Sequence, residues 1–341
     1  MVIIPPNLNL YFTAFDTLFQ SVYEDTPTWQ AQIASPFTCT TESWATAWAG
    51  MVNKLRIWKG ARVTNTLAPL TYGATMLPFE LTESIDQFKL DDDLHGVYAP
   101  LIKNMGMQSK KWPDYCIRDL IEANGDFSTT AFQTGPDGVS FWNSAHPVNF
   151  YDPGKGTYPN DYGAAGTVIN GTTVGGAFGV DSYATVKINH ATRKYENGER
   201  IGLQANLTMV PTEKEIAAKV VLQSDSFAPQ AINGLGSGNF PTAGSPVAAN
   251  APFVGAMTNP LRGTTDLMVN FDLTSAAAWY VLTTNLALNP FGFILRTAPY
   301  TTSLVAATDP NVFNSHNYVY GVTARGTPIW TLPWLASRSG V

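Results

Sequence analysis

The feature that most constrains this chain is a strand-to-helix corner at residues 206–225, NLTMVPTEKEIAAKVVLQSD. A β-branched run ends at Pro211, and a helix is predicted to begin at Thr212, whose side chain caps it while Glu215 completes a capping box. The side chains predicted to pack against a core are Ile216, Val220 and Val221. Because no nucleophile or phosphate-binding loop adjoins the corner, it indicates scaffolding in a chain that mixes helices with strands.

Two further helices are predicted in the N-terminal part of the chain. Apolar residues recur at helical spacing over residues 8–24 and again over 94–123. Pro113 is expected to kink or restart the second helix. The acidic run Asp91–Asp93 is interpreted as the N-terminal cap of that helix, because negative charge there complements the helix dipole.

The segment between these helices predicts a long hairpin. Its extended runs are RVTNTLAPL at 62–70 and ATMLPFELTESIDQF at 74–88. Pro78 in the second run indicates an edge strand, because proline has no backbone N–H to donate to a neighbouring strand.

The rest of the chain is rich first in loops and then in strands. Stretches dense in Gly, Pro, Asn or Ser at 134–179 and 226–263 predict long loops, and a helix is predicted over 181–194. The chain ends in short extended runs, which are DLMVNFDL, AWYVLTTN, FGFILRT and NYVYGVTARGTPIWTLPW.

The composition predicts a surface that is poor in charge. Only 13% of the residues are charged and 12% are aromatic, whereas an ordinary soluble domain has about 25% charged residues. We therefore expect partner subunits to cover much of the surface, although a neutral β-rich protein with a large core would also fit. The net charge of −6 and the lack of a basic stripe argue against tight electrostatic binding to nucleic acid.

The sequence lacks the usual signatures of catalytic, metal and membrane sites. VGGAFG at 174–179 has no acidic residue at dinucleotide-site spacing, and the histidines are isolated, with His146 explained by a polar turn. Cys39 and Cys116 suggest no disulfide framework, which favours a reducing compartment. No apolar run is long enough to span a bilayer. We expect no enzyme activity, no cofactor, no metal and no membrane contact.

The order of these elements resembles the major capsid proteins of tailed bacteriophages with the Hong Kong 97-type fold, and among them the Mu-like major head subunits. The motifs that carry the resemblance are FTAFDTLFQ, LRIWKGARVTNTLA, DDDLHGVYAPLIKNMG, FWNSAHPV, LTMVPTEKEIAAKVVLQSD and NYVYGVTARG. They cover nearly the whole chain, and none is a catalytic signature. The resemblance implies an α+β capsid fold.

That resemblance also implies a division of the chain. The expected parts are an N-terminal arm (1–50), an extended E-loop hairpin (51–92), a peripheral P-domain with a spine helix (93–198), an axial A-domain (199–300) and C-terminal strands that return to the P-domain (301–341).

Contacts between subunits are expected at the arm and the hairpin. The candidate interface residues are Phe15, Leu18, Phe19, Arg56, Trp58, Lys59, Arg62 and Arg325. The apolar face of the arm is predicted to need a neighbouring subunit to cover it. The arm is therefore expected to be dispensable for the subunit's own core.

The implied function is self-assembly, as pentamers and hexamers, into an icosahedral shell around double-stranded DNA, with no sequence-specific binding. Assembly in the host cytoplasm would produce part of the virion. Because Met1 leads almost directly into the arm, a separate scaffolding protein is expected, with a portal and a decoration protein as further candidate partners. Two alternatives stay open: an encapsulin-like protein nanocompartment, and a β-rich hydrolase whose site is assembled from scattered residues.

Overall fold

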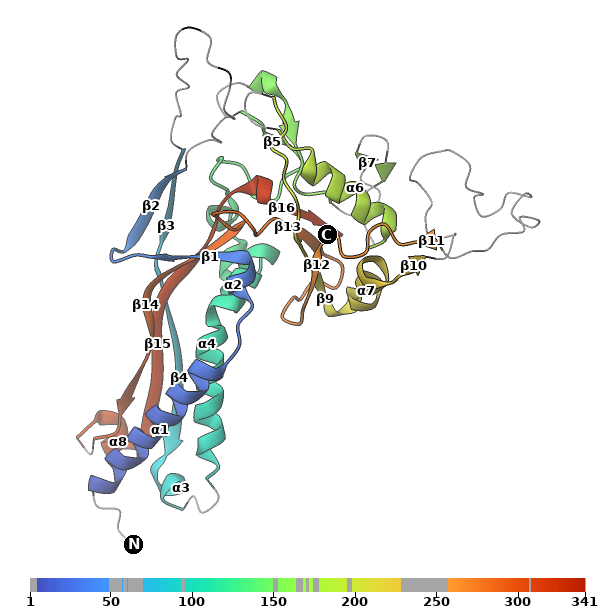
Figure 1. Ribbon diagram of the computed structural model, residues 1–341. Helices are drawn as coiled ribbons and strands as arrows, with labels where there is room; N and C mark the ends of the chain where they lie inside the picture. The colour runs from blue at the N-terminus through green and yellow to red at the C-terminus, as the bar shows by residue number, and fades with distance from the viewer. Residues whose placement is uncertain are drawn as a thin grey trace. The chain divides into compact units, whose positions relative to one another are not determined.

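The structure of the chain is a computed structural model, and Figure 1 shows the arrangement of its elements. It describes residues 5–48, 57, 60, 70–92, 96–149, 153–163, 168–169, 172–173, 178–194, 198–227, 257–306 and 308–340. The chain forms two compact units. Unit 1 comprises Met1–Ala45, Gly73–Ile117 and Gly292–Ile329, and unit 2 comprises Thr46–Tyr72, Arg118–Phe291 and Trp330–Val341.

Unit 1 is built on a four-stranded sheet with the strand order β1-β14-β15-β4. The strands are β1 (Ala34–Thr38), β4 (Leu77–Asp86), β14 (Phe291–Leu304) and β15 (Asn317–Trp330). Figure 1 shows α1 (Pro5–Asp25) and α4 (Tyr98–Glu122) running beside the long strands. The shorter helices are α2 (Gln30–Ile33), α3 (Gln87–Asp91) and α8 (Pro310–Ser315).

The core of unit 1 includes one face of α1. Phe12, Phe15 and Phe19 are three or four residues apart, so they share a helix face, and all three are buried. They form one cluster with apolar side chains from α4, β4 and β15. At Gly106 of α4, an added Cβ would lie 2.8 Å from the carbonyl oxygen of Phe19. The two helices therefore approach closely because this position lacks a side chain.

The long helix α4 differs from its sequence prediction at two points. It runs through Pro113 as one helix, so the helix does not restart there, and the kink expected at Pro113 stays a prediction. The acidic run is not its N-cap either, since Asp91 ends α3 and Asp92 is the C-cap of that helix. Gly96, with a φ of +67°, lies between the two helices, and α4 begins only at Tyr98.

The predicted hairpin is wrong in its second half. β4 pairs antiparallel with β15 over its whole length, from Leu77 opposite Gly326 to Asp86 opposite Asn317. It lies at the edge of the sheet, as Pro78 predicted. Of the first run, the described residue is Leu70, which begins β3 (Leu70–Thr75), the partner of β2 (Ser43–Trp48).

Unit 2 contains a second four-stranded sheet, with the order β12-β9-β13-β16. The strands are β9 (Leu207–Pro211), β12 (Asp266–Asn270), β13 (Trp279–Leu282) and β16 (Ala336–Ser339), and the main helices are α6 (Val180–Ala191) and α7 (Glu215–Gln223). β9 and β12 are parallel, whereas β13 is antiparallel to both β9 and β16.

The other elements of the chain are short. They are α5 (Thr130–Gln133), β5 (His146–Pro147), β6 (Thr157–Tyr158), β7 (Val168–Ile169), β8 (Thr172–Thr173), β10 (Ser226–Phe227), β11 (Met257–Thr258), and the 3₁₀ turns η1 (Gly125–Ser128), η2 (Pro153–Lys155), η3 (Thr212–Lys214) and η5 (Pro333–Leu335).

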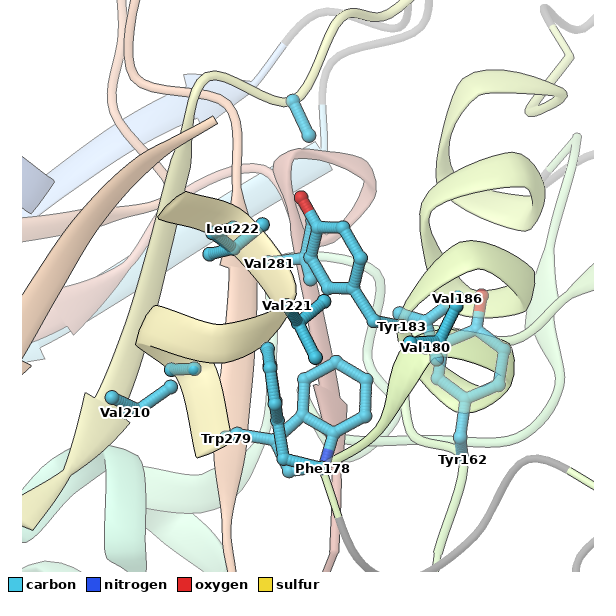
Figure 2. Close-up of a cluster of buried hydrophobic side chains, with 12 residues drawn as sticks. Tyr162, Phe178, Val180, Tyr183, Val186, Val210, Val221, Leu222, Trp279 and Val281 are labelled. Carbon is cyan, nitrogen blue, oxygen red and sulfur yellow. The ribbon is translucent and has the colours of Figure 1, made fainter. Parts of the chain in front are cut away.

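The core of unit 2 joins its helices to the sheet. Figure 2 shows Tyr183 of α6 and Trp279 of β13 within the same cluster as Val221 and Leu222 of α7. Tyr183 and Trp279 are fully buried. Every residue of β9 is buried, as is typical of a strand with both faces covered.

The strand-to-helix corner forms at the predicted place, but its helix faces another way. β9 ends at Pro211 and the turn η3 precedes α7, with no side-chain cap on either turn. The predicted capping box is therefore wrong. The buried side chains of α7 are Ala218, Val221 and Leu222, so the prediction is confirmed for Val221 and wrong for Ile216 and Val220. Ile216 is 79% exposed and Val220 is 51% exposed, because the face of the helix that packs carries Ala218, Val221 and Leu222 at i, i+3 and i+4 spacing.

Replacing Ile216 by aspartate is expected to leave the fold intact, with a change of at most about 0.5 kcal/mol in the free energy of unfolding. The reason is that this side chain already faces water. Val221→Asp, on the buried face of the same helix, should prevent formation of soluble protein, because it buries a charge. Denaturant unfolding and soluble yield measure the contrast. Equal losses from the two variants would contradict this orientation of α7.

Candidate functional site

The aromatic candidates of the arm lie inside unit 1. Phe15 and Phe19 are only 6% and 3% exposed, and Leu18 is partly buried against the same cluster. Strand β15 supplies much of their cover: the ring of Phe15 lies 6.3 Å from that of Tyr320. The prediction that this face needs a neighbouring subunit to bury it is wrong, because the chain's own strands do so.

The other candidate interface residues, four basic side chains and Trp58, have a different outcome. Arg325 lies in β15 opposite Pro78 of the edge strand, is half-buried, and has a buried Nε without a hydrogen-bond partner. Arg56, Trp58, Lys59 and Arg62 lie outside the described residues. Ile57, in the middle of that group, is described and is 81% exposed.

Large apolar side chains face solvent on both units. The main ones are Phe88, Val97, Leu304 and Phe313 in unit 1, and Ile188, Ile216, Val220, Phe271 and Leu286 in unit 2. Phe313 and Phe271 are 77% and 76% exposed. Contiguous patches of such groups mark contacts with partners, whereas single exposed apolar side chains are common on protein surfaces. Sequence reasoning missed most of them, because an apolar residue at helix or strand spacing was assigned to a core.

A groove lies in unit 1 between α4 and the face of the sheet formed by β4, β14 and β15. It has a volume of about 180 Å³, and its apolar lining includes Phe79 and Leu81 of β4 and Trp112 of α4. Trp112 packs closely on β15, since an added Cβ at Gly326 would lie 2.9 Å from its ring. The Nε1–H of Trp112 is buried and has no acceptor.

A serine and a histidine lie together in unit 2, but their hydrogen bonds stabilise the fold and do not form a catalytic pair. Ser337 Oγ is 2.9 Å from His190 Nδ1, and both residues are fully buried. His190 Nε2 is 2.8 Å from the Thr283 hydroxyl, which donates to the carbonyl of Gln204. Ser337 Oγ also accepts from Arg193. Because every polar atom of the pair is used and neither residue is accessible, the serine cannot act as a nucleophile.

Arg193 is a buried cation whose two terminal nitrogens donate to neutral acceptors, whereas its buried Nε–H has no hydrogen-bond partner. It donates to the carbonyls of Trp334 at 2.5 Å, Ala336 at 3.0 Å and Pro159 at 3.1 Å, and to Ser337 Oγ at 2.7 Å. Among the described residues no carboxylate pairs with it. Burial lowers the pKa of Arg193 from its usual value. Three of its four acceptors belong to the C-terminal segment, so this side chain fixes the last strand in place.

His146 also stabilises the fold. The sequence interpretation placed it in a polar turn but did not predict its burial or its two hydrogen bonds. Its ring is fully buried, with Nδ1 2.5 Å from Asp137 Oδ2 and Nε2 2.9 Å from the Phe141 carbonyl oxygen. Both nitrogens are thus engaged, and neither is available as a base. In the described ranges, no group of three or more His, Cys, Asp or Glu side chains is arranged to hold a metal ion.

Acidification is expected to destabilise unit 2 through His190. Burial, and secondly the nearby Arg193 cation, lower the pKa of His190 well below 6.5. Between that lowered value and 6.5, the unfolded chain binds a proton that the folded chain does not. Stability therefore falls as the pH decreases, by up to about 1.4 kcal/mol per pH unit.

Denaturant unfolding at about pH 7 and about pH 5.5 measures this dependence. His190→Gln should flatten it, since glutamine does not titrate. The exposed His316→Gln variant is the control and should keep the wild-type slope. A wild-type slope in His190→Gln would contradict the assignment.

Comparison with known proteins gives a family match over most of the chain. The model of the family described as "Mu-like prophage major head subunit gpT" matches residues 8–170 and 257–339. The chain is 28% identical over 174 residues to the major capsid protein of Escherichia phage Mu, covering 51% of this chain and 52% of that protein. It is 26% identical over 144 residues to the Mu-like prophage FluMu major head subunit of Haemophilus influenzae, covering 42% and 45%. The chain thus spans about half the length of the curated relatives it matches.

Solved structures show the same fold. The procapsid protein of bacteriophage JBD30 matches with a TM-score of 0.52 and 23% identity, over 99% of this chain and 76% of that chain. The capsid structure of the cyanophage P-SCSP1u matches with a TM-score of 0.52 and 10% identity, over 92% and 88%. These likenesses confirm the predicted fold class, a phage-capsid fold of the Hong Kong 97 type. Among the helices described, none combines the length and the apolar character needed to cross a membrane.

Proposed function

The chain belongs to the Mu-like prophage major head subunit gpT family, and we propose that it is the major capsid protein of a tailed phage. The observation that carries this proposal is the family match, which covers residues 8–170 and 257–339 and so reaches into both units. In this role the chain is a structural component of the virion and not an enzyme. The buried, fully bonded Ser337 and His190 support that reading over a hydrolase.

We further propose that the subunits assemble as pentamers and hexamers into an icosahedral shell around double-stranded DNA. The exposed apolar side chains of both units support extensive contacts between copies. Assembly takes place in the host cytoplasm, with a scaffolding protein, a portal and a decoration protein as separate partners. The division into arm, E-loop, P-domain and A-domain is part of the same proposal, with β4 now placed in the sheet of unit 1.

Negative-stain microscopy of the expressed protein tests the proposal, and closed particles of uniform size are the expected result. A monomer or small oligomer that turns over a substrate, seen by gel filtration and activity assay, would overturn it. The contents of particles purified from infected cells distinguish a phage shell from a protein nanocompartment: DNA supports the first, and packaged enzymes would support the second.

Free subunits are expected to bind DNA negligibly near physiological salt. The chain has 26 acidic and 20 basic residues, so its net negative charge disfavours binding to phosphates. A shell that must release its genome also has no need of high affinity for DNA. Titration of labelled duplex DNA measures the affinity. Binding tighter than about micromolar, with a steep dependence on salt, would contradict this expectation.

A further inference from the structure

A second hollow in unit 1 lies between α4 and the strands β1 and β14, and the segment that joins α1 to β1 forms part of its wall. We call it the β1 hollow, because all the residues of β1 line it. Its volume is about 480 Å³, which is in the range of sites for small organic molecules. Every residue that lines it belongs to unit 1. The proposed function assigns no role to this hollow.

The wall of the β1 hollow is mostly apolar and aromatic. Phe37, Trp112 and Phe293 each contribute a ring, and Pro113 and Pro299 also line it. The rings of Trp112 and Phe293 are 5.1 Å apart and nearly perpendicular. A ligand with an aromatic or aliphatic body therefore buries apolar surface when it enters.

Close packing holds this wall in place before any ligand enters. An added Cβ at Gly292 of β14 would lie 2.7 Å from the ring of Phe37, so that ring lies directly on the strand. The rim is fixed as well, because the carboxylate of Asp114 on α4 accepts from the backbone N–H of Gln30 at 2.9 Å. A site that is already formed loses little free energy to ordering when a ligand binds.

Two donors in the wall of the β1 hollow lack an acceptor. The Nε1–H of Trp112 is buried and has no hydrogen-bond partner, which is unfavourable for a buried donor. The Nζ of Lys110 lies over the ring of Tyr23, 4.7 Å from its centre, and both residues line the hollow. Within the described part of the chain, no carboxylate forms an ion pair with Lys110.

These donors select the charge of the ligand. A purely apolar ligand would leave both donors without an acceptor, and Lys110 would repel a cation. Among the described residues that line the hollow, Lys110 is the one with a charged side chain, so it balances a single negative charge. A carboxylate supplies that charge together with two acceptor oxygens. A phosphate monoester would bring a second charge that nothing in the wall balances.

We propose that the β1 hollow binds a small monocarboxylate with an aromatic or aliphatic body. The body lies against Phe37 and Phe293, and the carboxylate pairs with Lys110. The Nε1–H of Trp112 donates to an oxygen of the ligand. The site lies within one subunit, so binding does not require a shell, and a failure of this proposal would leave the proposed function standing.

Titration calorimetry with 4-phenylbutyrate tests the site, and the neutral 4-phenylbutyramide is the matched ligand. The two compounds share a ring and a chain and differ in charge. The wild-type chain should bind the carboxylate with a Kd of about 1 mM or tighter, as is usual for a ligand of this size. It should bind the amide about tenfold more weakly. No saturable binding of either compound, or equal affinity for the two, would overturn the proposal.

Lys110→Gln should abolish the preference for the carboxylate, because it removes the cation, and should leave the affinity for the amide unchanged. Lys103→Gln is the matched control. Lys103 is an exposed lysine of the same helix that does not line the hollow, and its variant should keep the tenfold preference. An equal loss of preference in the two variants would show a general effect of charge on α4 and would overturn the site.

Trp112→Phe keeps an aromatic ring but removes the N–H, so it should weaken the binding of both compounds about fivefold. Circular dichroism of the variant without ligand checks its fold. Wild-type affinity in a folded Trp112→Phe variant would contradict the hydrogen bond assigned to Trp112. If that variant does not fold, the comparison of Lys110→Gln with Lys103→Gln decides the proposal.

Discussion

Replacing Arg193 by leucine is expected to lower the free energy of unfolding by about 3–5 kcal/mol, enough to remove most of the stability of an ordinary domain. The variant keeps an apolar side chain of some length but leaves the carbonyls of Pro159, Trp334 and Ala336 buried without their donor. Each unsatisfied acceptor costs about 1–3 kcal/mol. Denaturant unfolding measures the loss, and limited proteolysis should show early release of the C-terminal segment.

Arg262→Leu is the matched control. It removes the same charge from an ion pair with Asp225 whose side chains are 59% and 79% exposed, and such pairs contribute at most about 1 kcal/mol. Arg193→Lys should fall between the two, because an ammonium group cannot reach acceptors on several sides as a guanidinium does. A loss in Arg193→Leu no larger than in Arg262→Leu would mean that the carbonyls find other donors.

Phe19→Ala is expected to cost about 3–5 kcal/mol, because it opens a cavity in the core of unit 1. Phe19 is 3% exposed, and its carbonyl oxygen would lie 2.8 Å from a Cβ added at Gly106 of α4. Removal of Met1 to Ile33 should have a larger effect and abolish the fold of unit 1. This reverses the sequence-based expectation that the arm is dispensable for the core.

The control for this prediction lies on the same helix. Gln20→Ala, next to Phe19 but exposed, should change the free energy of unfolding by no more than about 0.5 kcal/mol. Denaturant unfolding of free subunits measures both variants. A cooperative, wild-type unfolding transition in the truncated chain would show that unit 1 folds without α1, and would contradict the prediction.

Local patterns predicted the elements that depend on neighbouring residues. The helix expected at 181–194 is α6, Val180–Ala191, and the C-terminal extended runs form β12 to β15. Each is encoded by side-chain periodicity within one short window. The fold class followed from the order of these elements, which the matching structures confirm.

Features that depend on distant residues could not be predicted in this way. β4 has an alternating pattern that suits any antiparallel partner, and nothing within it identifies β15, which comes much later in the chain. Arg193 looks like an ordinary charged residue at the end of a helix, since the carbonyls that bind it come from the C-terminus. The low charge and high aromatic content were assigned to subunit contacts, yet Trp279 and Trp330 are fully buried in the chain itself.

The two units interleave along the chain, and this has a consequence for synthesis on the ribosome. Unit 1 needs Gly292–Ile329 for two strands of its sheet, and unit 2 needs Trp330–Val341 for its last strand. Nascent chains that lack these segments expose the apolar faces of α1 and β9, so they should depend on chaperones until translation ends. Premature termination should therefore yield chains that lack both folded units and that aggregate or are degraded.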